Sequence, residues 1–289
     1  MDRPGNSQVH AEDQSINTPH EATRRQPDVS RSIEMVGLIP AGGLGSRIAP
    51  LCCSKEIFPI GFRQVDDGHS LRPKAVCEYL IERMSHASIR KIFLVLRPGK
   101  WDIPAYLGDG STCNVHLAYL VARLPFGAPY TLDQAYPFVR NSLVAIGFPD
   151  IIFEPDDAFK ILAQRQSATG ADLVLGLYPT DRPQITDMVE CADDGWVRSF
   201  VVKPQHTTLR DTWIIAVWTP VFTQFMHEYL AFCQMRDAAH SVELSVGDII
   251  RVALKKGMKA FAVPFPAHHF VDVGTPSDLA RTIRKYALP

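Results

Sequence analysis

The sequence predicts an α/β fold in which helices cover both faces of a mostly parallel central sheet. Short apolar runs alternate along the chain with amphipathic runs of helical period, which is the pattern of strands followed by crossover helices. The strand-like runs are apolar throughout rather than at every second position, as expected of strands buried on both faces. The chain of 289 residues is long enough for one large domain or two small ones with a substantial core.

The chain opens with a segment that differs from the rest in composition. Residues 1–33 contain almost no large apolar side chains, so they cannot bury enough surface to offset the entropy lost on ordering. We therefore expect a disordered N-terminal tail at 1–33. The remainder, residues 34–289, is expected to form a single domain, and it contains no internal repeat.

The first half of this domain alternates between strands and helices. It begins with a strand-like apolar run at residues 35–40. Residues 74–86 carry apolar side chains near helical spacing, and residues 156–170 form an amphipathic pattern that opens with acidic residues and closes at Gly170, a typical helix C-cap. Further buried strands are expected at four apolar runs: residues 91–97, 114–121, 142–148 and 171–179.

The second half changes character at residues 187–218. Short strand-like runs around the turn ADDG predict a small antiparallel insertion there. Two helices are expected next, at about residues 219–236 and 242–257. The expected order ends with three elements: a strand at 259–265, an extended run at 269–274 and a helix that begins at Pro276.

Composition and charge exclude several classes of protein. Apolar residues make up 46% and charged residues 21%, and the net charge of −1 gives no electrostatic footprint for nucleic acid or a membrane surface. No apolar stretch approaches the ~20 residues that a membrane helix needs. The six cysteines show no zinc-ligand spacing, and we interpret them as buried small hydrophobic residues of a cytoplasmic protein.

A glycine-rich turn with the sequence AGGLGSR, residues 41–47, follows the first predicted strand. Glycines let the backbone approach a phosphate and leave N–H groups free to bind its charge, so this arrangement is typical of an anion site. The turn matches neither of two common phosphate-binding motifs. A dinucleotide fingerprint needs a third glycine near the place of Arg47, and a Walker loop ends in Gly-Lys-Ser/Thr, which is absent here. Arg47 and Lys55 favour a polyphosphate, because both are cations beside the glycines. A plain glycine turn without a ligand is the alternative.

Six motifs occur in order between about residues 35 and 287. They are PAGGLGSR…SKEIFPIG (40–61), RPKAVCEYLIERM (72–84), YLGDGS (106–111), FPDIIFEP (148–155), ECADDGWVRSFVVKP (190–204) and FVDVGTPSDL (270–279). Together they resemble the sugar-1-phosphate nucleotidyltransferases, the family of glucose-1-phosphate thymidylyltransferase and UTP–glucose-1-phosphate uridylyltransferase. No single motif decides the resemblance, whereas the ordered set is specific.

The resemblance implies a Rossmann-like three-layer α/β/α fold of the nucleotide-diphospho-sugar transferase type. It also implies an Mg²⁺-dependent reaction in which an oxygen of a sugar-1-phosphate attacks the α-phosphorus of a nucleoside triphosphate and releases pyrophosphate. dTTP is the favoured nucleotide and UTP the next. Both substrates are expected at the carboxyl ends of the strands, and the related enzymes lead us to expect a homo-oligomer.

The resemblance further implies roles for four charged residues. Arg47 is expected to hold the β- and γ-phosphates that leave, and Lys55 to contact the α-phosphate. Asp150 and Asp272 are expected to bind Mg²⁺. A carboxylate at position 272, between two valines, would be unfavourable without a ligand, whereas Asp150 has the alternative role of a simple turn residue.

Other residues are expected to hold the two substrates. Lys203 is assigned by the resemblance to the sugar phosphate, with a surface lysine of a hairpin as the alternative. Gly127 is expected to let the base approach the backbone. The nucleotide is expected to be cradled by the backbone of four residues of the glycine turn: Ala41, Gly42, Gly43 and Gly45.

Several positions depart from the family pattern and leave both substrates open. Ala122 stands where the family usually has a glutamine that reads the pyrimidine edge. Val202 and Asp187 replace a glutamate and a glycine that normally face the sugar, and the metal segment reads Phe-Pro-Asp in place of Leu-Gly-Asp. Two alternatives therefore stay open: a cytidylyltransferase that acts on a non-sugar phosphate, and a catalytically silent paralogue that binds a nucleotide sugar.

Overall fold

The computed structural model describes residues 33–64, 70–123, 127–236 and 243–286. The predicted tail at 1–33 lies outside these residues except for Ile33, so its disorder stays a prediction. The described chain from Ile33 onward belongs to one compact unit.

A nine-stranded sheet lies at the centre of the described residues. Its parallel part has the order β5-β4-β1-β6 and is made of β1 Met35–Pro40, β4 Lys91–Leu96, β5 His116–Val121 and β6 Leu143–Ile146. All four strands fall within runs that the sequence predicted as buried strands. Because β1 is flanked by β4 and β6, the glycine turn that follows it opens at the carboxyl edge of this parallel part, where α/β sheets bind ligands.

The other part of the sheet is mixed. It is made of five strands: β8 Leu173–Pro179, β9 Met188–Cys191, β10 Val197–Val201, β11 Asp211–Trp218 and β12 Ala260–Pro264. β12 runs parallel to β8, whereas β9 and β10 form an antiparallel hairpin at one edge.

β11 corrects one prediction from the sequence. The expected antiparallel insertion at residues 187–218 is present as the β9–β10 hairpin, but β11 does not belong to a separate insertion. It pairs with both β6 and β8 and so joins the two parts of the main sheet. Residues 212–218 are all buried, which explains why the strand is apolar from Trp213 to Trp218 although its neighbours β6 and β8 run antiparallel to it.

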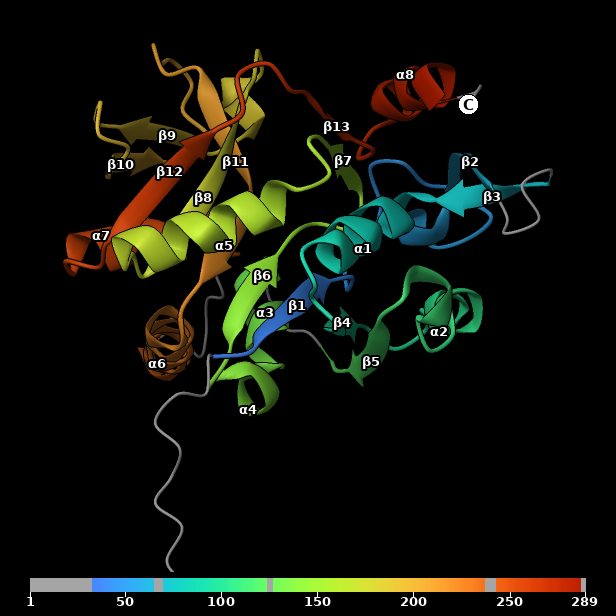
Figure 1. Ribbon diagram of the computed structural model, residues 1–289, viewed down its shortest axis with the longest axis horizontal. Coiled ribbons are helices and arrows are strands. Elements are labelled where there is room, and N and C mark those ends of the chain that lie inside the picture. Colours follow the sequence, from blue (N-terminus) through green and yellow to red (C-terminus); the bar gives the residue numbers. More distant parts are fainter. Residues whose placement is uncertain (1–32, 65–69, 124–126, 237–242, 287–289) are drawn as a thin grey trace, which may run out of the picture. The chain divides into compact units, whose positions relative to one another are not determined.

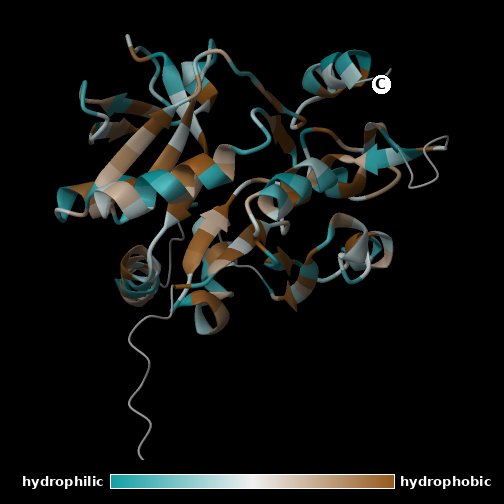
Figure 2. Ribbon diagram, viewed as in Figure 1, coloured by the Kyte–Doolittle hydropathy of each residue, from teal (hydrophilic) through white to brown (hydrophobic). Residues whose placement is uncertain are grey.

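Helices cover both faces of the sheet (Figure 1). One core cluster joins the sheet to α1 Val76–His86 and α5 Ala158–Thr169. The other joins it to four helices: α3 Gly127–Asp133, α4 Tyr136–Val139, α6 Pro220–Arg236 and α7 Val246–Lys255. Figure 2 shows the hydrophobic residues concentrated on the central strands. The predicted three-layer fold is therefore confirmed. Among the described helices, none combines the length and apolar composition that a membrane span requires.

Several short elements were not predicted from the sequence. They are β2 Pro59–Gln64, β3 Leu71–Ala75, α2 Asp102–Leu107, α3, α4 and β7 Ile151–Phe153. Lys74 lies in β3, not at the start of α1 as predicted, because residues 71–75 pair with β2. Its ammonium group forms an ion pair with Glu82. All six cysteines are free.

The cysteines divide between the core and the surface. Cys77 and Cys113 are buried as expected, whereas Cys52 and Cys191 are exposed. The prediction that the cysteines are buried is therefore wrong for the latter two, which lie in a loop and at the end of the hairpin strand β9.

A two-stranded ribbon determines where the predicted metal-binding residues lie. β7 pairs antiparallel with β13 Phe270–Asp272, and Asp272 stands opposite Ile151. The backbone N–H of Val273 also donates a hydrogen bond to the carbonyl of Asp150, at 2.8 Å. The ribbon therefore places the backbones of Asp150 and Asp272 side by side, although they are far apart in the sequence.

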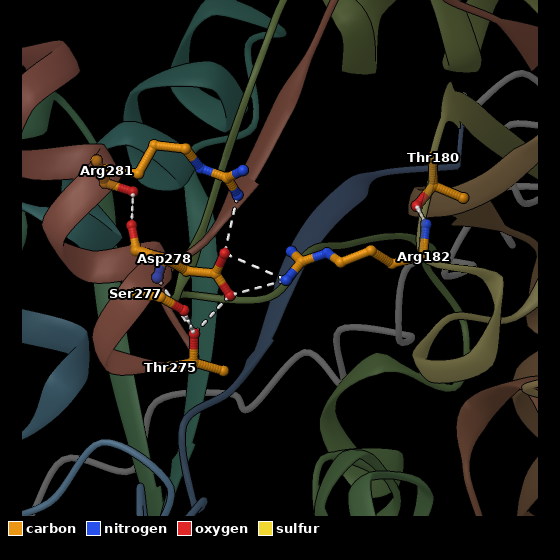
Figure 3. A network of polar contacts seen from close by, with 7 residues as sticks. Thr180, Arg182, Thr275, Ser277, Asp278 and Arg281 are labelled. Carbon is orange, nitrogen blue, oxygen red and sulfur yellow. Dashed lines mark hydrogen bonds and ion pairs between the residues drawn. The ribbon is translucent and has the colours of Figure 1, made fainter.

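Polar contacts at the start of α8 Pro276–Tyr286 fasten this helix to the rest of the fold (Figure 3). Asp278, whose side chain is 6% exposed, accepts from Arg281 at 2.8 Å and from Arg182, which follows β8, at 3.1 Å. Thr275 donates to the same carboxylate at 2.8 Å and accepts from the Asp278 N–H at 3.2 Å, which caps the helix. Because α8 follows β13 directly, these contacts also stabilise the segment that carries Asp272.

We predict that Asp278→Asn lowers the free energy of unfolding by about 2 kcal/mol, because it removes the charge that two arginines and a hydroxyl share. Burial alone would raise the pKa of Asp278, but the hydrogen bonds from Thr275 and Arg182 and the arginine charges lower it below 3.8. The stabilisation is therefore present above pH 3.8 and is lost as the pH falls through the lowered pKa of the folded state.

Urea unfolding of the unchanged protein and of Asp278→Asn, at pH 7 and in acid, measures this effect. Asp193→Asn, which changes an exposed carboxylate, is the control and should cost less than about 0.5 kcal/mol. Equal losses in the two variants, or a loss that grows in acid, would contradict the assignment.

Candidate active site

The glycine turn lies directly after β1. Ala41 is buried, and its N–H donates to the Val95 carbonyl at 2.9 Å, which fixes the turn to β4. Gly45 has a φ of +66°, a left-handed conformation that favours glycine. The aliphatic part of Lys55 packs across the turn, since a Cβ at Gly45 would lie 3.6 Å from its Cδ.

The structure brings together the four charged residues that were predicted to handle phosphate and metal. The Lys55 ammonium group donates a hydrogen bond to the Asp150 carboxylate. Arg47 and Asp272 both reach Gly274, where a Cβ would lie 2.8 Å from Asp272 Oδ1 and 3.2 Å from Arg47 Nη2. Two carboxylates and two cations therefore converge where the glycine turn meets the β7–β13 ribbon.

The protonation of this group of residues depends on burial and on its own charges. Burial and the neighbouring Asp150 carboxylate raise the pKa of Asp272 to about 6, although Lys55 and Arg47 partly oppose the shift. Burial acts to lower the pKa of Lys55, but Asp150 outweighs it and the net shift is upward. Lys55 is therefore held as a cation, while Asp272 is a carboxylate with too little compensating positive charge.

The aspartate pair fits a magnesium ion. Asp272 Oδ1 is buried and has no hydrogen-bond partner among the described residues, which is unfavourable unless a cation binds it. Within the described residues there is no group of three or more His, Cys, Asp or Glu side chains that could hold a metal. Two carboxylates supplemented by substrate oxygens and water are a typical arrangement for Mg²⁺, which keeps several such ligands.

A cavity of about 560 Å³ opens on the glycine turn, and we call it the nucleotide cavity. Its lining includes five residues predicted for the nucleotide side of the site: Gly42, Gly43, Arg47, Lys55 and Gly127. Asp150 also lines it, whereas Ala41 and Gly45 do not. Gly127 has a φ of +78°, and a Cβ there would lie 2.3 Å from the Leu244 carbonyl oxygen. The approach of Leu244 thus requires glycine at 127, independently of any contact with a base.

Two residues that the sequence analysis did not single out also line the nucleotide cavity. Glu56 is 1% exposed and accepts from Lys100 at 2.6 Å, and burial raises its pKa against the Lys100 charge. Arg97 follows β4, and its Nε is buried without a partner, as is Glu56 Oε2. The position of Arg97 after a parallel strand was the available signal, because such strand ends form ligand sites.

A second cavity of about 460 Å³ adjoins the first, and we call it the acceptor cavity. It is lined by Lys203, Asp187, Trp213 and Asp272, among others. Lys203 is exposed, follows β10 and has a φ of +41°. Five residues line both cavities: Arg47, Ala128, Phe148, Asp150 and Glu243. The charged group of residues therefore lies at the junction between two spaces, each large enough for a small molecule.

A larger cavity, of about 650 Å³, meets the acceptor cavity at Phe270 and is lined by Arg182, Arg210 and Arg281. It contains none of the predicted site residues. The convergence of Arg47, Lys55 and the aspartate pair is better evidence for a functional site than the volume of a cavity. It locates the candidate site in the nucleotide and acceptor cavities.

Known proteins resemble most of this chain in sequence. The model of the family described as nucleotidyl transferase matches residues 36–288. Agl11, a low-salt glycan biosynthesis nucleotidyltransferase of Haloferax volcanii, is 24% identical over 248 residues, which are 85% of this chain and 64% of Agl11. A glucose-1-phosphate thymidylyltransferase of Neisseria gonorrhoeae is 25% identical over 252 residues, 85% of this chain and 80% of that protein.

Solved structures share the fold. A Bacillus anthracis protein, described as a glucose-1-phosphate thymidylyltransferase and solved with a sucrose, superposes with a TM-score of 0.71 at 20% identity, over 87% of this chain and 95% of that one. A UDP-glucose pyrophosphorylase complexed with UDP-glucose superposes with a TM-score of 0.68 at 15% identity, over 89% and 99% of the two chains.

We predict that Lys55→Met lowers the free energy of unfolding at pH 7 by roughly 2–3 kcal/mol, because it leaves Asp150 without its ion-pair partner and removes a positive charge that favours ionised Asp272. The Lys55 and Asp150 side chains are only 16% and 14% exposed, so solvent does little to replace the lost pair. Chemical denaturation measures the change.

Lys91→Met is the matched control, since it breaks an ion pair with Glu34 whose side chains are 56% and 55% exposed. It should cost less than about 1 kcal/mol. Equal losses in the two variants would show that Lys55 does not balance the aspartate pair.

Proposed function

The chain belongs to the nucleotidyl transferase family, and we propose that it transfers a nucleotidyl group from a nucleoside triphosphate to a sugar-1-phosphate with release of pyrophosphate. The observation that carries this proposal is the position of Arg47, Lys55, Asp150 and Asp272 at the junction of the nucleotide and acceptor cavities. A reaction that joins two phosphates needs cations at the point where the two substrates meet.

In the proposed reaction an oxygen of the acceptor phosphate forms a bond to the α-phosphorus, and the bond from that phosphorus to the bridging oxygen of the β-phosphate breaks. The electron pair leaves with pyrophosphate. Arg47 binds the departing phosphates with its planar guanidinium group, and Lys55 offsets negative charge on the α-phosphate. Lys203, which lines the acceptor cavity, binds the acceptor phosphate. The main contribution of these residues is to hold two anions together against their repulsion.

Asp150 and Asp272 would hold the magnesium ion. When bound, Mg²⁺ supplies positive charge that offsets the charge of the phosphates. The buried Asp272 Oδ1 without a partner supports this assignment, as does the raised pKa of its carboxyl.

The proposed nucleotide is dTTP, with UTP next, because the relatives include glucose-1-phosphate thymidylyltransferases and a UDP-glucose pyrophosphorylase shares the fold. One observation keeps CTP as an alternative. Ala122 carries no amide group, whereas Glu56 and Arg97 line the nucleotide cavity, and each has a buried polar atom without a partner among the described residues. The assembly state of the chain stays a prediction.

Asp272→Asn is expected to reduce pyrophosphate release by roughly 10²-fold or more, and EDTA should abolish release by the unchanged protein. The assay contains Mg²⁺, one of dTTP, UTP or CTP, and a panel of acceptor phosphates. Asp181→Asn is the control and should retain full activity, because Asp181 is exposed and lines the larger cavity of Arg182, Arg210 and Arg281. Nucleotide binding without release from any pair of substrates would favour the catalytically silent paralogue.

Gly274→Ala tests the arrangement of Arg47 and Asp272 without removing either. The added methyl group must displace the Asp272 carboxylate or the Arg47 guanidinium, since it would lie 2.8 Å and 3.2 Å from them. We expect kcat to fall at least ~10-fold, in line with the sensitivity of catalysis to small displacements. Ser277→Ala, at an exposed position nearby, should leave kcat unchanged. Unchanged kcat in Gly274→Ala would show that this arrangement is not needed for turnover.

A further inference from the structure

One carboxylate of the acceptor cavity has no function in the transfer reaction described above. Asp187 lines this cavity close to Lys203 and Trp213. None of the ion pairs within 4.0 Å in the described residues includes it, and its Oδ1 is buried without a hydrogen-bond partner. A phosphate acceptor alone gives no reason for a negative charge here, since the two would repel each other.

The fold holds this carboxylate in place. Asp187 comes directly before β9, and its Oδ2 packs against the first turn of α7, where a Cβ at Gly247 would lie only 2.2 Å away. Burial raises the pKa of Asp187, and the Lys203 charge together with the Trp213 and Lys203 N–H groups offsets part of that increase. The N-terminal end of α7 also favours the ionised form. The acceptor cavity therefore carries a fixed carboxylate that forms no ion pair within 4.0 Å among the described residues.

Aromatic rings share the acceptor cavity with this carboxylate. Phe148, Trp213 and Phe270 line the same cavity, and the rings of Phe148 and Trp213 meet edge to face with centroids 5.7 Å apart. A carboxylate beside aromatic faces is a typical environment for an ammonium group, because ring quadrupoles and the negative charge both attract the cation. A neutral hydroxyl group gains much less from the rings.

The β9–β10 hairpin places opposite charges along the cavity wall. Val201 pairs with Met188, so Lys203 and Asp187 leave the same end of the hairpin on its two strands. Lys203 provides a positive charge for the acceptor phosphate. Asp187 and the aromatic rings provide a negative charge and π-electron density that attract a cation. The two sites together match a molecule that carries a phosphate and an ammonium group.

We propose that the acceptor is a phosphate monoester bearing an ammonium group, which Asp187 and the Trp213 ring bind while its phosphate faces Lys203 and the aspartate pair. This inference rests on the proposed transfer reaction and narrows its acceptor. Amino sugar phosphates and phosphorylated amino alcohols both have this chemistry.

Binding of matched phosphates to the full chain with Mg²⁺ at pH 7 tests the proposal by isothermal titration calorimetry. Each pair differs in the cation: glucosamine-1-phosphate against glucose-1-phosphate, and choline phosphate against neohexyl phosphate, its uncharged carbon isostere. We expect the charged member of at least one pair to bind about 10-fold more tightly. Equal affinity within both pairs would overturn the proposal. The pair with the larger difference distinguishes an amino sugar from an amino alcohol.

Asp187→Asn provides the second test, because it keeps the shape of the side chain and removes its charge. The preference for the charged member should disappear, while the affinity for glucose-1-phosphate stays the same. An equal loss for both members would mean that Asp187 only maintains the structure, and would overturn the proposal. If this variant does not fold, the comparison on the unchanged protein still decides.

Pyrophosphate release with dTTP, UTP or CTP separates this inference from the proposed function. Transfer to glucose-1-phosphate as efficient as transfer to the ammonium-bearing phosphates would overturn the inference and leave the transferase function intact. A preference for the ammonium group in calorimetry, without pyrophosphate release from any pair of substrates, would overturn the transferase function and support the ammonium site.

Discussion

The pairing of β7 with β13 is the constraint on which the candidate site depends. It places Asp150 and Asp272 side by side and largely removes them from water, although like charges repel and each loses hydration. The fold responds with Lys55 on Asp150 and Arg47 near Asp272, yet Asp272 keeps a buried oxygen without a partner. This residual negative charge makes the arrangement suited to a divalent cation and poorly explained as a purely structural ion-pair network.

The rest of the fold supports this pairing from two directions. The parallel strands β1, β4 and β6 present their carboxyl ends at one edge, so the glycine turn after β1 reaches the ribbon with Lys55 packed across it. On the other side, Arg182 and Arg281 fasten Asp278 at the start of α8, directly after β13 (Figure 3). The end of the ribbon that carries the two aspartates is thus held by long-range contacts from Lys55 and Arg182.

The two adjoining cavities share some charged lining residues and differ in the rest of their walls. Arg47 and Asp150 line both cavities, as the proposed transfer between two phosphates requires. The walls that would recognise the base and the acceptor carry residues of different character. Glu56 and Arg97 bring buried polar atoms to one cavity, whereas Asp187 and aromatic rings line the other. In the proposed reaction, a change of the wall residues would therefore alter substrate choice without disturbing the charged residues at the junction.

The sequence by itself determined the order of the long elements, the three-layer fold and the glycine turn, because apolar periodicity and glycine placement are local signals. The short strand β7 escaped it, since a strand of three residues forms only through its partner, and β13 lies far along the chain. β11 looked like part of an insertion because its place between β6 and β8 depends on long-range pairing. Only the tertiary structure brought Asp150 to Asp272 and Leu244 onto Gly127, and left Asp187 without an ion pair to any described residue, because these proximities and burials arise from packing between distant segments.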